Sequence, residues 1–435
     1  MKVRAIFGPP GTGKTRTLVE LAAKHAERNH RVLYLSYTKA AAAEATSRLK
    51  AKVATPSTLH SLAFNALNYN RHSVVDFMKL RSFGAETGFP FKGDDGTDEP
   101  QEGDEYKTVM SFARNAMIQT VEAYDFLGRP GTLDRMFAFE KSYNDWKFAF
   151  GYVDFDDMLE QFSRTKLNGV PKRVIFLDEA QDCSPLQWKA FTNLCSPEDD
   201  KPTHVYIAGD DDQAIFEWNG ADPHGMINFT EQRSSEVKIL EQSYRLPVEV
   251  HTLSTGIIET VEKRVPKSFK STGKKGSIEC WRDIEMVADR LDKVAPNGAL
   301  ILVRDRFKMG EVKKIFNRDM IPYDVYGGSS PWTNKYAKGL KDGSMSKKDV
   351  PFAWWNFYDQ ADLSQPVKYH LSTIHGAKGR EHDTVIVDLE LPARVLSNLA
   401  SDRDPEVRTQ YVALTRASNK LVLCGSNPIV QAETI

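Results

Sequence analysis

Residues 3–37 have the sequence VRAIFGPPGTGKTRTLVELAAKHAERNHRVLYLSY, and this stretch decides the fold class. The apolar run VRAIF predicts a buried strand, the Gly/Pro-rich segment after it predicts a loop, and RTLVELAAKHAERN predicts a helix. VLYLSY (32–37) predicts a second buried strand, and the alanine-rich segment 39–52 predicts the next helix. An alternation of strands and helices of this kind is typical of a parallel sheet with helices on both faces.

Further apolar segments extend this pattern along the chain. RVIFLDEAQD (173–182) and HVYIAGDDDQ (204–213) predict two more strands of the first sheet. A second set of strands is predicted in residues 299–305, 369–379, 384–391 and 420–426. Residues 62–153 have a mostly helical pattern, interrupted by an acidic loop at 93–105. The simplest architecture is therefore two α/β units with mostly helical insertions.

Length and composition exclude several classes of protein. A chain of 435 residues is expected to form two or three domains. Hydrophobic residues make up 41% and charged residues 27%, which excludes disorder as the main state. No stretch approaches the ~18–20 apolar residues of a membrane span, and we expect neither a secretory signal nor a transit peptide. The four cysteines lie far apart without a C-x-x-C pair, which favours a reducing, cytoplasmic setting over a zinc site or a disulfide framework.

Charge alone identifies no partner. The chain has 58 Lys and Arg against 59 Asp and Glu, a net charge of −1. Between Lys263 and Lys348 the balance is 20 basic to 10 acidic residues, whereas 93–105 has seven acidic residues and no basic one. Such runs are more often solvated faces than binding sites. We expect the segment Lys335–Lys348 to be an exposed basic loop.

The loop after the first strand matches a phosphate-binding pattern. Its sequence Gly8-Pro9-Pro10-Gly11-Thr12-Gly13-Lys14-Thr15 fits G-x-x-x-x-G-K-[ST]. Glycines let backbone N–H groups turn inward around a β-phosphate, and the following helix adds its positive N-terminal end. Lys14 would place its charge on the β- and γ-phosphate oxygens, and the Thr15 hydroxyl would bind Mg²⁺. An incidental glycine-rich turn is the alternative, and the position between a strand and a helix argues against it.

Acidic residues at the end of a later strand complement this loop. Four apolar residues place Asp178 and Glu179 at the carboxyl end of the sheet, where ligands bind in open α/β folds. Asp178 would hold Mg²⁺ through water, and Glu179 would orient and deprotonate the attacking water. Gln213 also follows a buried strand and an acidic cluster, so its amide would sense the γ-phosphate or that water. A solvated strand end is the alternative for a lone Asp-Glu pair, and the phosphate loop argues against it.

Several segments resemble superfamily 1 helicases of the UvrD/Rep type, in the order of that family. They are LDEAQD (177–182), AGDDDQAIFEWNGAD (208–222), LEQSYR (240–245), STIHGAKGREHDTVIV (372–387) and QYVALTRASNKLVL (410–423). SYTKAAAAEATSRL (36–49) and STLHSLAFNAL (57–67) resemble the DNA-contact motifs of the family's first domain, and DFDDML (154–159) and YGGSSPWTN (326–334) resemble two further family segments. The resemblance runs from residue 3 to about residue 423.

The resemblance implies a fold and domain boundaries. It implies two RecA-like P-loop NTPase domains, each a mostly parallel sheet flanked by helices, with a mostly helical insertion in the first. The implied first domain is 1–61 and 154–245, interrupted by the helical insertion 62–153. The implied second domain is 246–328 and 367–435, interrupted by a reduced accessory insertion, 329–366.

The resemblance also implies roles at the nucleotide. Arg245 and Arg416 would be arginine fingers, which stabilise charge developing on a transferred phosphoryl group. Arg16 and Tyr244 would enclose the adenine, and Glu381 would accept a hydrogen bond from the ribose. Each arginine taken alone is more often a surface charge. ATP would hold a cleft between the two domains closed, and its hydrolysis would release it.

For single-stranded DNA, Trp218 is the implied base-stacking residue. The other implied DNA contacts are Tyr37, Lys39, Thr58, His60 and His375. Stacking on an aromatic ring stabilises binding by ~1–3 kcal/mol per base and tolerates any sequence. Two alternatives stay open at this point: Trp218 as a core tryptophan, and His60 and His375 as ordinary satisfied histidines.

The chain departs from the family in three places. Only seven residues precede Gly8, and they include no glutamine that would read the adenine edge, so we expect weakened discrimination of ATP from GTP. About 35 residues separate Asn334 from the strand before His375, so the large accessory insertion is reduced to a loop. The aromatic residues of this loop, Trp354, Trp355 and Phe357, form either a strand-separating or partner surface or a small local core. Asn219 stands where an arginine often follows the tryptophan, which removes one expected phosphate contact.

The function implied is an ATP-dependent DNA helicase and translocase that uses ATP and Mg²⁺ and moves 3′ to 5′ on single strands. The direction comes from the family alone. The alternatives are a single-strand translocase that displaces proteins with little unwinding, and a nucleotide-gated DNA-binding module of a replication or repair complex. Expected partners are single-stranded DNA, single-strand/duplex junctions and replication or repair proteins, and no membrane. We expect a cytoplasmic monomer without a fused nuclease, and salt-sensitive binding that is independent of sequence.

Overall fold

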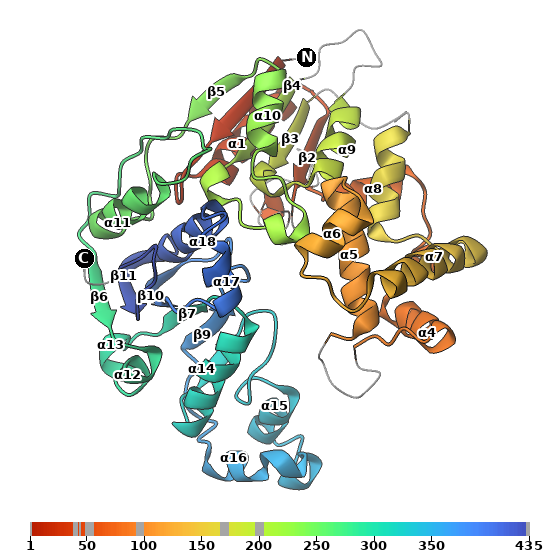
Figure 1. Cartoon of the computed structure of the whole chain (residues 1–435). Coiled ribbons are helices and arrows are strands. Elements are labelled where there is room, and N and C mark those ends of the chain that lie inside the picture. Colours follow the sequence, from red (N-terminus) through yellow and green to blue (C-terminus); the bar gives the residue numbers. More distant parts are fainter. Residues whose placement is uncertain are drawn as a thin grey trace. The chain divides into compact units, whose positions relative to one another are not determined.

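A computed structural model of the chain describes residues 2–37, 42, 45–47, 56–92, 100–165, 174–195 and 204–431. The chain divides into two compact units (Figure 1). The first unit comprises residues 1–8 and 13–240, and the second comprises residues 9–12 and 241–435. Each unit contains one parallel sheet flanked by helices, which confirms the predicted fold class. The predicted domain boundaries stay a prediction.

The first sheet has the order β2-β3-β4-β1-β5. Its strands are β1 (Lys2–Phe7), β2 (Val32–Ser36), β3 (Val174–Asp178), β4 (His204–Gly209) and β5 (Glu236–Ile239), and all neighbours are parallel. Every residue of β3 is buried, because helices cover both faces of the sheet at this strand. The order places the carboxyl ends of β3, β4 and β1 side by side, and the three loops that leave these ends are therefore neighbours.

Helices of the first unit fall into two groups. Those beside the sheet are α1 (Lys14–Glu27), α9 (Pro185–Cys195) and α10 (Gly225–Gln232). Those between β2 and β3 are α3 (Leu59–Ala66), α4 (Phe77–Thr87), α5 (Glu102–Ala116), α6 (Thr120–Phe126), α7 (Leu133–Phe150) and α8 (Phe155–Arg164). The second group has its own aromatic core around Phe83, Phe139 and Tyr143. It confirms the predicted helical insertion. The predicted alanine-rich helix 39–52 lies largely outside the described residues.

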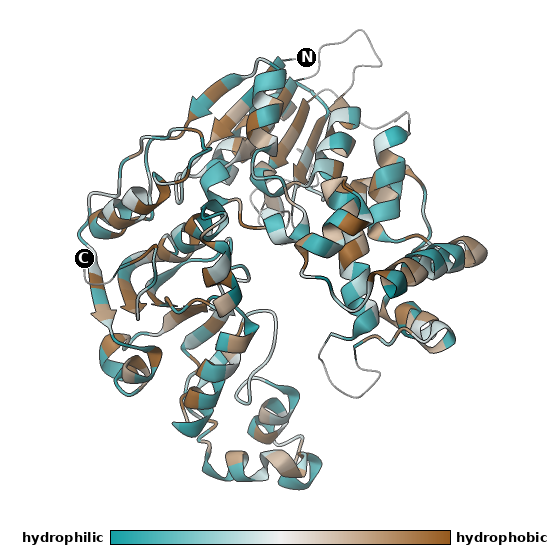
Figure 2. Cartoon of the chain, in the orientation of Figure 1, coloured by the Kyte–Doolittle hydropathy of each residue, from teal (hydrophilic) through white to brown (hydrophobic). Residues whose placement is uncertain are grey.

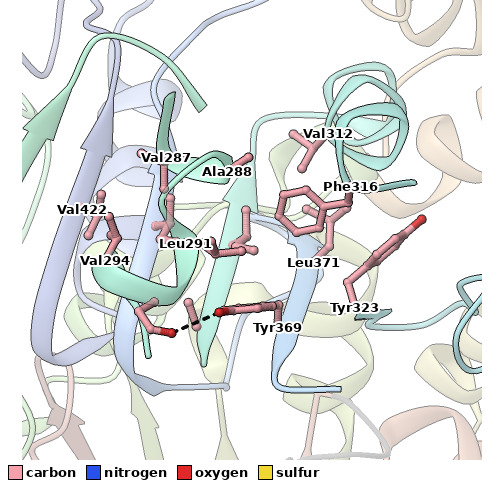
Figure 3. Packing of buried hydrophobic residues seen from close by; sticks show 14 of the residues in the cluster. Val287, Ala288, Leu291, Val294, Val312, Phe316, Tyr323, Tyr369, Leu371 and Val422 are labelled. Carbon is pink, nitrogen blue, oxygen red and sulfur yellow. Dashed lines mark hydrogen bonds between the residues drawn. The ribbon is translucent and has the colours of Figure 1, made fainter. Parts of the chain in front are cut away.

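The second sheet has the order β6-β11-β10-β7-β9-β8. Its strands are β6 (Ser277–Trp281), β7 (Ala299–Val303), β8 (Tyr323–Val325), β9 (Tyr369–Thr373), β10 (His382–Asp388) and β11 (Ala417–Cys424). Figure 3 shows part of the core on this sheet, where Phe316 and Leu371 pack together and the Tyr369 hydroxyl donates to the Ala295 carbonyl at 3.3 Å. Hydrophobic residues concentrate in the strands of both sheets (Figure 2).

Eight helices of the second unit are described. They are α11 (Val248–Ile258), α12 (Ile284–Ala288), α13 (Leu291–Val294), α14 (Arg306–Arg318), α15 (Lys335–Asp342), α16 (Trp355–Gln360), α17 (Ala393–Asn398) and α18 (Asp404–Leu414). The tryptophan-bearing loop between β8 and β9 is a small local core in part: Phe357 packs edge-to-face on the buried Trp332, with ring centroids 5.5 Å apart. Phe352 of the same loop is 82% exposed.

The prediction of an exposed basic loop at Lys335–Lys348 is wrong. Residues Lys335–Asp342 form helix α15, and a short 3₁₀ turn follows at Lys347–Asp349. The helix begins where the Asn334 side chain accepts a hydrogen bond from the Ala337 N–H at 2.9 Å, and it ends at Gly343, whose φ of 75° is left-handed. These two capping residues stabilise a helix that the lysine-rich composition alone did not predict.

Candidate functional site

The glycine-rich loop connects β1 to α1 in the first unit. The Gly8 N–H donates to the Gly209 carbonyl at 3.0 Å, which ties the start of the loop to the end of β4. Lys14 Nζ donates to the Gly8 carbonyl at 2.6 Å, so the side chain folds back over the loop. Helix α1 begins after Gly13 (φ 82°), and no side chain of the described residues caps its first turn. The first turn of α1 therefore has no side-chain cap in the part of the chain that the structure describes, and a helix end of this kind attracts anions.

Residues Pro9–Thr12 of this loop cluster with the second unit. The Ser243 hydroxyl donates to the Pro10 carbonyl and the Tyr244 N–H donates to the Gly11 carbonyl, both at 2.8 Å. Gly11 has a φ of +71°, and a Cβ there would lie 2.4 Å from Cβ of Arg245. Only glycine fits this position, which explains the glycine in the pattern.

The acidic pair lies directly beside the loop. Asp178, at the end of β3, is fully buried. Its Oδ2 accepts hydrogen bonds from the Thr15 hydroxyl at 2.8 Å and the Tyr34 hydroxyl at 2.9 Å. Its Oδ1 accepts from the Glu179 N–H at 3.0 Å. Burial and, to a smaller extent, the neighbouring charge of Glu179 raise the pKa of Asp178 to about 6. A cation bound here would favour the ionised carboxylate.

Glu179 has an unusual backbone conformation. Its φ is 55°, in the left-handed region that non-glycine residues rarely adopt. Backbone strain of this kind is held in place by surrounding contacts and is concentrated at functional sites. Here the Gln181 amide fixes the side chain, because its Nε2 donates to Glu179 Oε2 at 2.6 Å.

Gln181 joins the acidic pair to the loop after β4. Its Oε1 accepts from the Asp210 N–H at 3.0 Å, and Gln213 Nε2 donates to Asp210 Oδ2 at 2.7 Å. A chain of contacts therefore runs from Glu179 through Gln181 and Asp210 to Gln213. Sequence reasoning did not select Gln181, although it stands two residues after Glu179 in LDEAQD. Gly209 permits the approach, since a Cβ there would lie 2.4 Å from Gln181 Oε1.

Oxygen ligands for a magnesium ion are present at this point of the first unit. The Thr15 hydroxyl and the Asp178 carboxylate lie 2.8 Å apart, and hard oxygen ligands of this kind suit Mg²⁺. Mg²⁺ usually binds through one or two protein oxygens together with phosphates and waters. Within the described residues, no group of three or more His, Cys, Asp or Glu side chains could enclose a metal on its own. The arrangement therefore fits a metal that arrives with a phosphate ligand.

The two predicted arginine fingers lie in the second unit in different surroundings. Arg245 forms an ion pair with Glu381. Arg416 is 2% exposed, and its Nε donates to the Val412 carbonyl at 2.9 Å while its Nη1 donates to the Arg380 carbonyl at 3.3 Å. The roles of Arg245, Glu381 and Arg416 at a nucleotide stay predictions.

The two residues predicted to enclose a base are exposed. The Arg16 side chain is 77% exposed and forms an ion pair with Glu20 at 2.9 Å. Tyr244 is 76% exposed. Exposure leaves the Tyr244 ring and the Arg16 guanidinium group accessible to a ligand, and the adenine-binding role stays a prediction.

Three aromatic residues form a row at the other predicted site. The rings of Tyr37 and Phe216 are stacked with centroids 5.9 Å apart, and Phe216 and Trp218 meet edge-to-face at 6.3 Å. Trp218 is 51% exposed, which excludes the alternative of a core tryptophan. Phe216 is a member of the row that sequence reasoning missed, although it stands two residues before Trp218 in the same segment. The row offers stacking surfaces on the outside of the first unit.

A cavity of about 940 Å³ in the first unit brings three predicted DNA contacts together. Tyr37, Thr58 and His60 line it, with Phe64 and Phe155 from the helices. The Thr58 hydroxyl caps α3 by accepting from the Ser61 N–H at 3.2 Å. The polar residues of the wall include Arg71, Asp76, Ser111, Asn115, Asp156, Ser184, Gln187 and Asn219.

His60 is held neutral in this cavity. Burial lowers the pKa of His60 to about 4, so the ring is uncharged at pH 7. Its ring meets Phe155 edge-to-face with centroids 5.7 Å apart. An uncharged ring beside phenyl groups suits a flat apolar ligand face better than a phosphate. His375 lies half-buried in the second unit, and Lys39 lies outside the described residues.

Comparisons with known proteins identify the family. Residues 2–234 match the UvrD/REP helicase N-terminal domain, and residues 358–427 match the UvrD-like helicase C-terminal domain. DNA helicase II of Haemophilus influenzae is 29% identical over 206 residues, 43% of this chain and 28% of that protein. ATP-dependent DNA helicase PcrA of Staphylococcus epidermidis is 24% identical over 389 residues, 77% of this chain and 50% of that protein. The matched part is thus half or less of each relative's length.

One solved structure, an arterivirus nonstructural protein 10 (helicase), aligns with 97% of this chain and 59% of its own, at 12% identity and a TM-score of 0.39. Within the described residues, no helix combines the length and apolarity needed to cross a membrane. The first family match alone covers more than half of the sequence, and the predicted resemblance is confirmed. The chain belongs to the UvrD/REP helicase family.

Proposed function

We propose that this chain is an ATP-dependent DNA helicase and translocase that moves 3′ to 5′ on single-stranded DNA. The observation that carries the proposal is the 2.8 Å hydrogen bond from the Thr15 hydroxyl to the Asp178 carboxylate. It joins the phosphate-binding pattern to the acidic pair, which are 163 residues apart in the sequence. Together with the family match, this contact supports a nucleoside triphosphatase site.

The residues of the first unit divide the work of hydrolysis among them. The loop amides and Lys14 would bind the β- and γ-phosphates of ATP. Thr15 and Asp178 would hold Mg²⁺, which would supply positive charge beside those phosphates. Glu179 orients the attacking water and takes its proton. Gln213 senses the γ-phosphate, and its contact with Asp210 links that sensor to Gln181 and Glu179.

The second unit contains the two arginines that would act on the transferred phosphoryl group. Arg416 and Arg245 are its candidates for arginine fingers, and Glu381 holds Arg245 in an ion pair. A finger stabilises the charge that spreads over the transferred phosphoryl oxygens, and it accelerates hydrolysis by ~10³–10⁵-fold. Dependence of hydrolysis on residues of both units is what converts a nucleotide cycle into motion.

Single-stranded DNA would bind at the cavity and the aromatic row. Tyr37, His60 and Phe155 offer ring faces and edges for bases, and Trp218 adds an exposed indole. Contacts through ring faces tolerate any base, which suits a motor that moves along arbitrary sequence.

The second candidate is a translocase that displaces proteins and unwinds little. The small two-helix segment between β8 and β9, where relatives carry a large accessory insertion, favours it. A gated binding module is less well supported, because Lys14, Asp178, Glu179, Gln213 and Arg416 are all present, and a switch does not need the full hydrolytic set.

Strand displacement tests these candidates together. Duplexes with a 3′ or a 5′ single-stranded tail are incubated with the protein, ATP and Mg²⁺, beside single strands that carry streptavidin on a biotinylated end. The helicase proposal predicts unwinding of the 3′-tailed duplex and displacement of streptavidin from the 5′ end. Streptavidin displacement without unwinding supports the translocase. If the protein binds DNA but shows neither unwinding nor streptavidin displacement, both motor candidates are contradicted.

A further inference from the structure

The Tyr34 hydroxyl is a second side-chain donor to the carboxylate of Asp178, and no pattern in the sequence pointed to it. It donates to Asp178 Oδ2 at 2.9 Å, the same oxygen that accepts from Thr15 at 2.8 Å. Tyr34 and Asp178 are both fully buried. A buried hydroxyl aimed at a buried carboxylate is a strong contact, because the ionised acceptor shortens and strengthens the hydrogen bond.

The register of the sheet explains how the hydroxyl reaches this carboxylate. Tyr34 on β2 pairs with Phe176 on β3, and Asp178 stands two residues further along β3. Two residues of a strand rise about 6.6 Å, and side chains in strands lean along the strand direction. A tyrosine ring in register with Phe176 therefore spans the step to Asp178.

Aromatic stacking fixes the position of this ring. Tyr34 stacks on Phe176 with centroids 5.9 Å apart and an angle of 15° between the planes. Phe176 in turn stacks on Tyr206 of β4 at 4.8 Å and 8°. Three neighbouring strands thus hold three rings in a row, and packed rings of this kind leave the hydroxyl little freedom to move.

We propose that Tyr34 is a positioning residue that holds the Asp178 carboxylate in the orientation required for Mg²⁺ with a nucleotide. The inference rests on the proposed function. The Thr15 hydroxyl can donate to Asp178 and at the same time offer a lone pair to a metal. Tyr34 supplies a donor that does not depend on the metal or on the glycine-rich loop. Partners of metal ligands orient the ligand, and their loss typically lowers metal affinity by 10–100-fold.

The test is the Mg²⁺ dependence of nucleotide binding without hydrolysis. Fluorescence anisotropy of a dye-labelled, non-hydrolysable ATP analogue is followed while Mg²⁺ is titrated into wild type and Tyr34→Phe. Tyr34→Phe keeps the ring on Phe176 and removes only the hydroxyl. We expect its Mg²⁺ midpoint to rise by about tenfold.

Tyr206→Phe is the matched control. It removes a hydroxyl from the same aromatic stack, but that hydroxyl lies 2.9 Å from His25 Nε2 and 3.3 Å from Arg4 Nη1, away from Asp178. We expect an unchanged Mg²⁺ midpoint. Thermal unfolding checks that each variant folds. If Tyr34→Phe does not fold, Tyr34→4-fluorophenylalanine takes the place of that variant in the titration, because the fluorine fills the volume of the hydroxyl.

Each result of the titration supports or overturns the proposal. A shift in the Tyr34 variant alone supports it. An unchanged midpoint in that variant, or equal shifts in both, overturns the inference and leaves the proposed function standing. A wild-type protein that binds the nucleotide analogue without any dependence on Mg²⁺ overturns the inference and the proposed metal site together.

Discussion

The two units differ in how the N-terminus of a helix that follows a strand of the sheet is capped. In the first unit, β1 leads into α1 through Gly13, and no side chain of the described residues caps that helix. In the second unit, β7 leads into α14 through Asp305, whose carboxylate accepts from the Lys308 N–H at 2.9 Å. The first helix end can accept an anionic ligand, whereas a protein carboxylate already fills the second.

The residues at the carboxyl ends of the strands also differ between the two sheets. β3, β4 and β1 are neighbours, and their ends carry the acidic pair, Gln213 with its acidic cluster, and the glycine-rich loop. At the end of β7, Arg304 forms an ion pair with Glu406 at 2.8 Å, an internal contact of the second unit. We therefore expect the phosphate and metal chemistry at the first sheet, and we propose that the second unit contributes arginines.

The largest effect is expected from an arginine of the second unit. If Arg416 is a finger, Arg416→Lys lowers DNA-stimulated hydrolysis by about 10³-fold or more, because a lysine cannot reproduce the planar charge. Arg408→Lys is the control, since Arg408 is equally buried and donates to the Lys263 carbonyl at 3.0 Å. Steady-state hydrolysis measures both. Equal losses would break the comparison, because burial alone would then explain the effect.

A smaller effect is expected from Gln181 of the first unit. Gln181→Leu leaves the Glu179 carboxylate and the Asp210 N–H without their shared partner. Hydrogen bonds to charged groups contribute about 1.5–3 kcal/mol, so we expect hydrolysis to fall by about 10- to 150-fold at unchanged nucleotide affinity. Gln410→Leu removes a fully buried glutamine from the second unit and should leave the rate unchanged. A loss of affinity with an intact rate constant would contradict the positioning role.

Replacement of Trp218 should change the affinity for DNA alone. Trp218→Ala removes one stacking surface, worth ~1–3 kcal/mol, so the Kd for single-stranded DNA should rise by about 5- to 150-fold. Phe148→Ala removes another exposed aromatic side chain, 91% exposed on α7, as a control for non-specific effects. Fluorescence anisotropy with a labelled oligonucleotide measures both, and an unchanged Kd for Trp218→Ala would remove the aromatic row from the DNA site.

The smallest effect concerns pH and the stability of the first unit. His25 lies 2.9 Å from both His30 Nδ1 and the Tyr206 hydroxyl, and burial, with the neighbouring His204 and His30, lowers the pKa of His25 to about 4. The unfolded chain, with a pKa near 6.5, then binds the proton first, so acidification from pH 6.5 to 4 lowers the free energy of unfolding.

The variant His25→Asn should lose less stability over the same pH range, as urea unfolding at several pH values would measure. Comparing it with wild type cancels the opposite contribution of Asp178, whose raised pKa of about 6 favours the folded state on acidification. Parallel pH dependences in the two proteins would contradict the assignment to His25.

Interior strands and the nucleotide motifs could be predicted from the sequence, whereas of the four edge strands only β2 could be. Interior strand β7 is apolar throughout, and β3 is apolar up to Asp178, because both faces of each sheet are covered there. The other edge strands, β5, β6 and β8, lack that pattern: β5 and β6 carry exposed residues, and β8 has only three residues. Helix α15 is rich in lysine, which favours an exposed loop, and its caps Asn334 and Gly343 are what indicate a helix.

Contacts that depend on the register between strands also could not be predicted from the sequence. Tyr34 meets Asp178 only because β2 and β3 pair with Ser36 beside Asp178. Gln181 and Phe216 stand inside recognised segments, but only the folded chain shows which side chains they touch. The patterns predicted which residue types gather at the strand ends, and the fold determined how they hold one another.

The most direct test of the central claim is steady-state ATP hydrolysis with and without a single-stranded DNA oligomer, for wild type and Glu179→Gln. We predict strong stimulation by DNA in wild type and a loss of about 10²–10⁴-fold in the variant, the usual contribution of a general base. Tight DNA binding without stimulated hydrolysis in wild type would contradict the motor and favour a gated binding module.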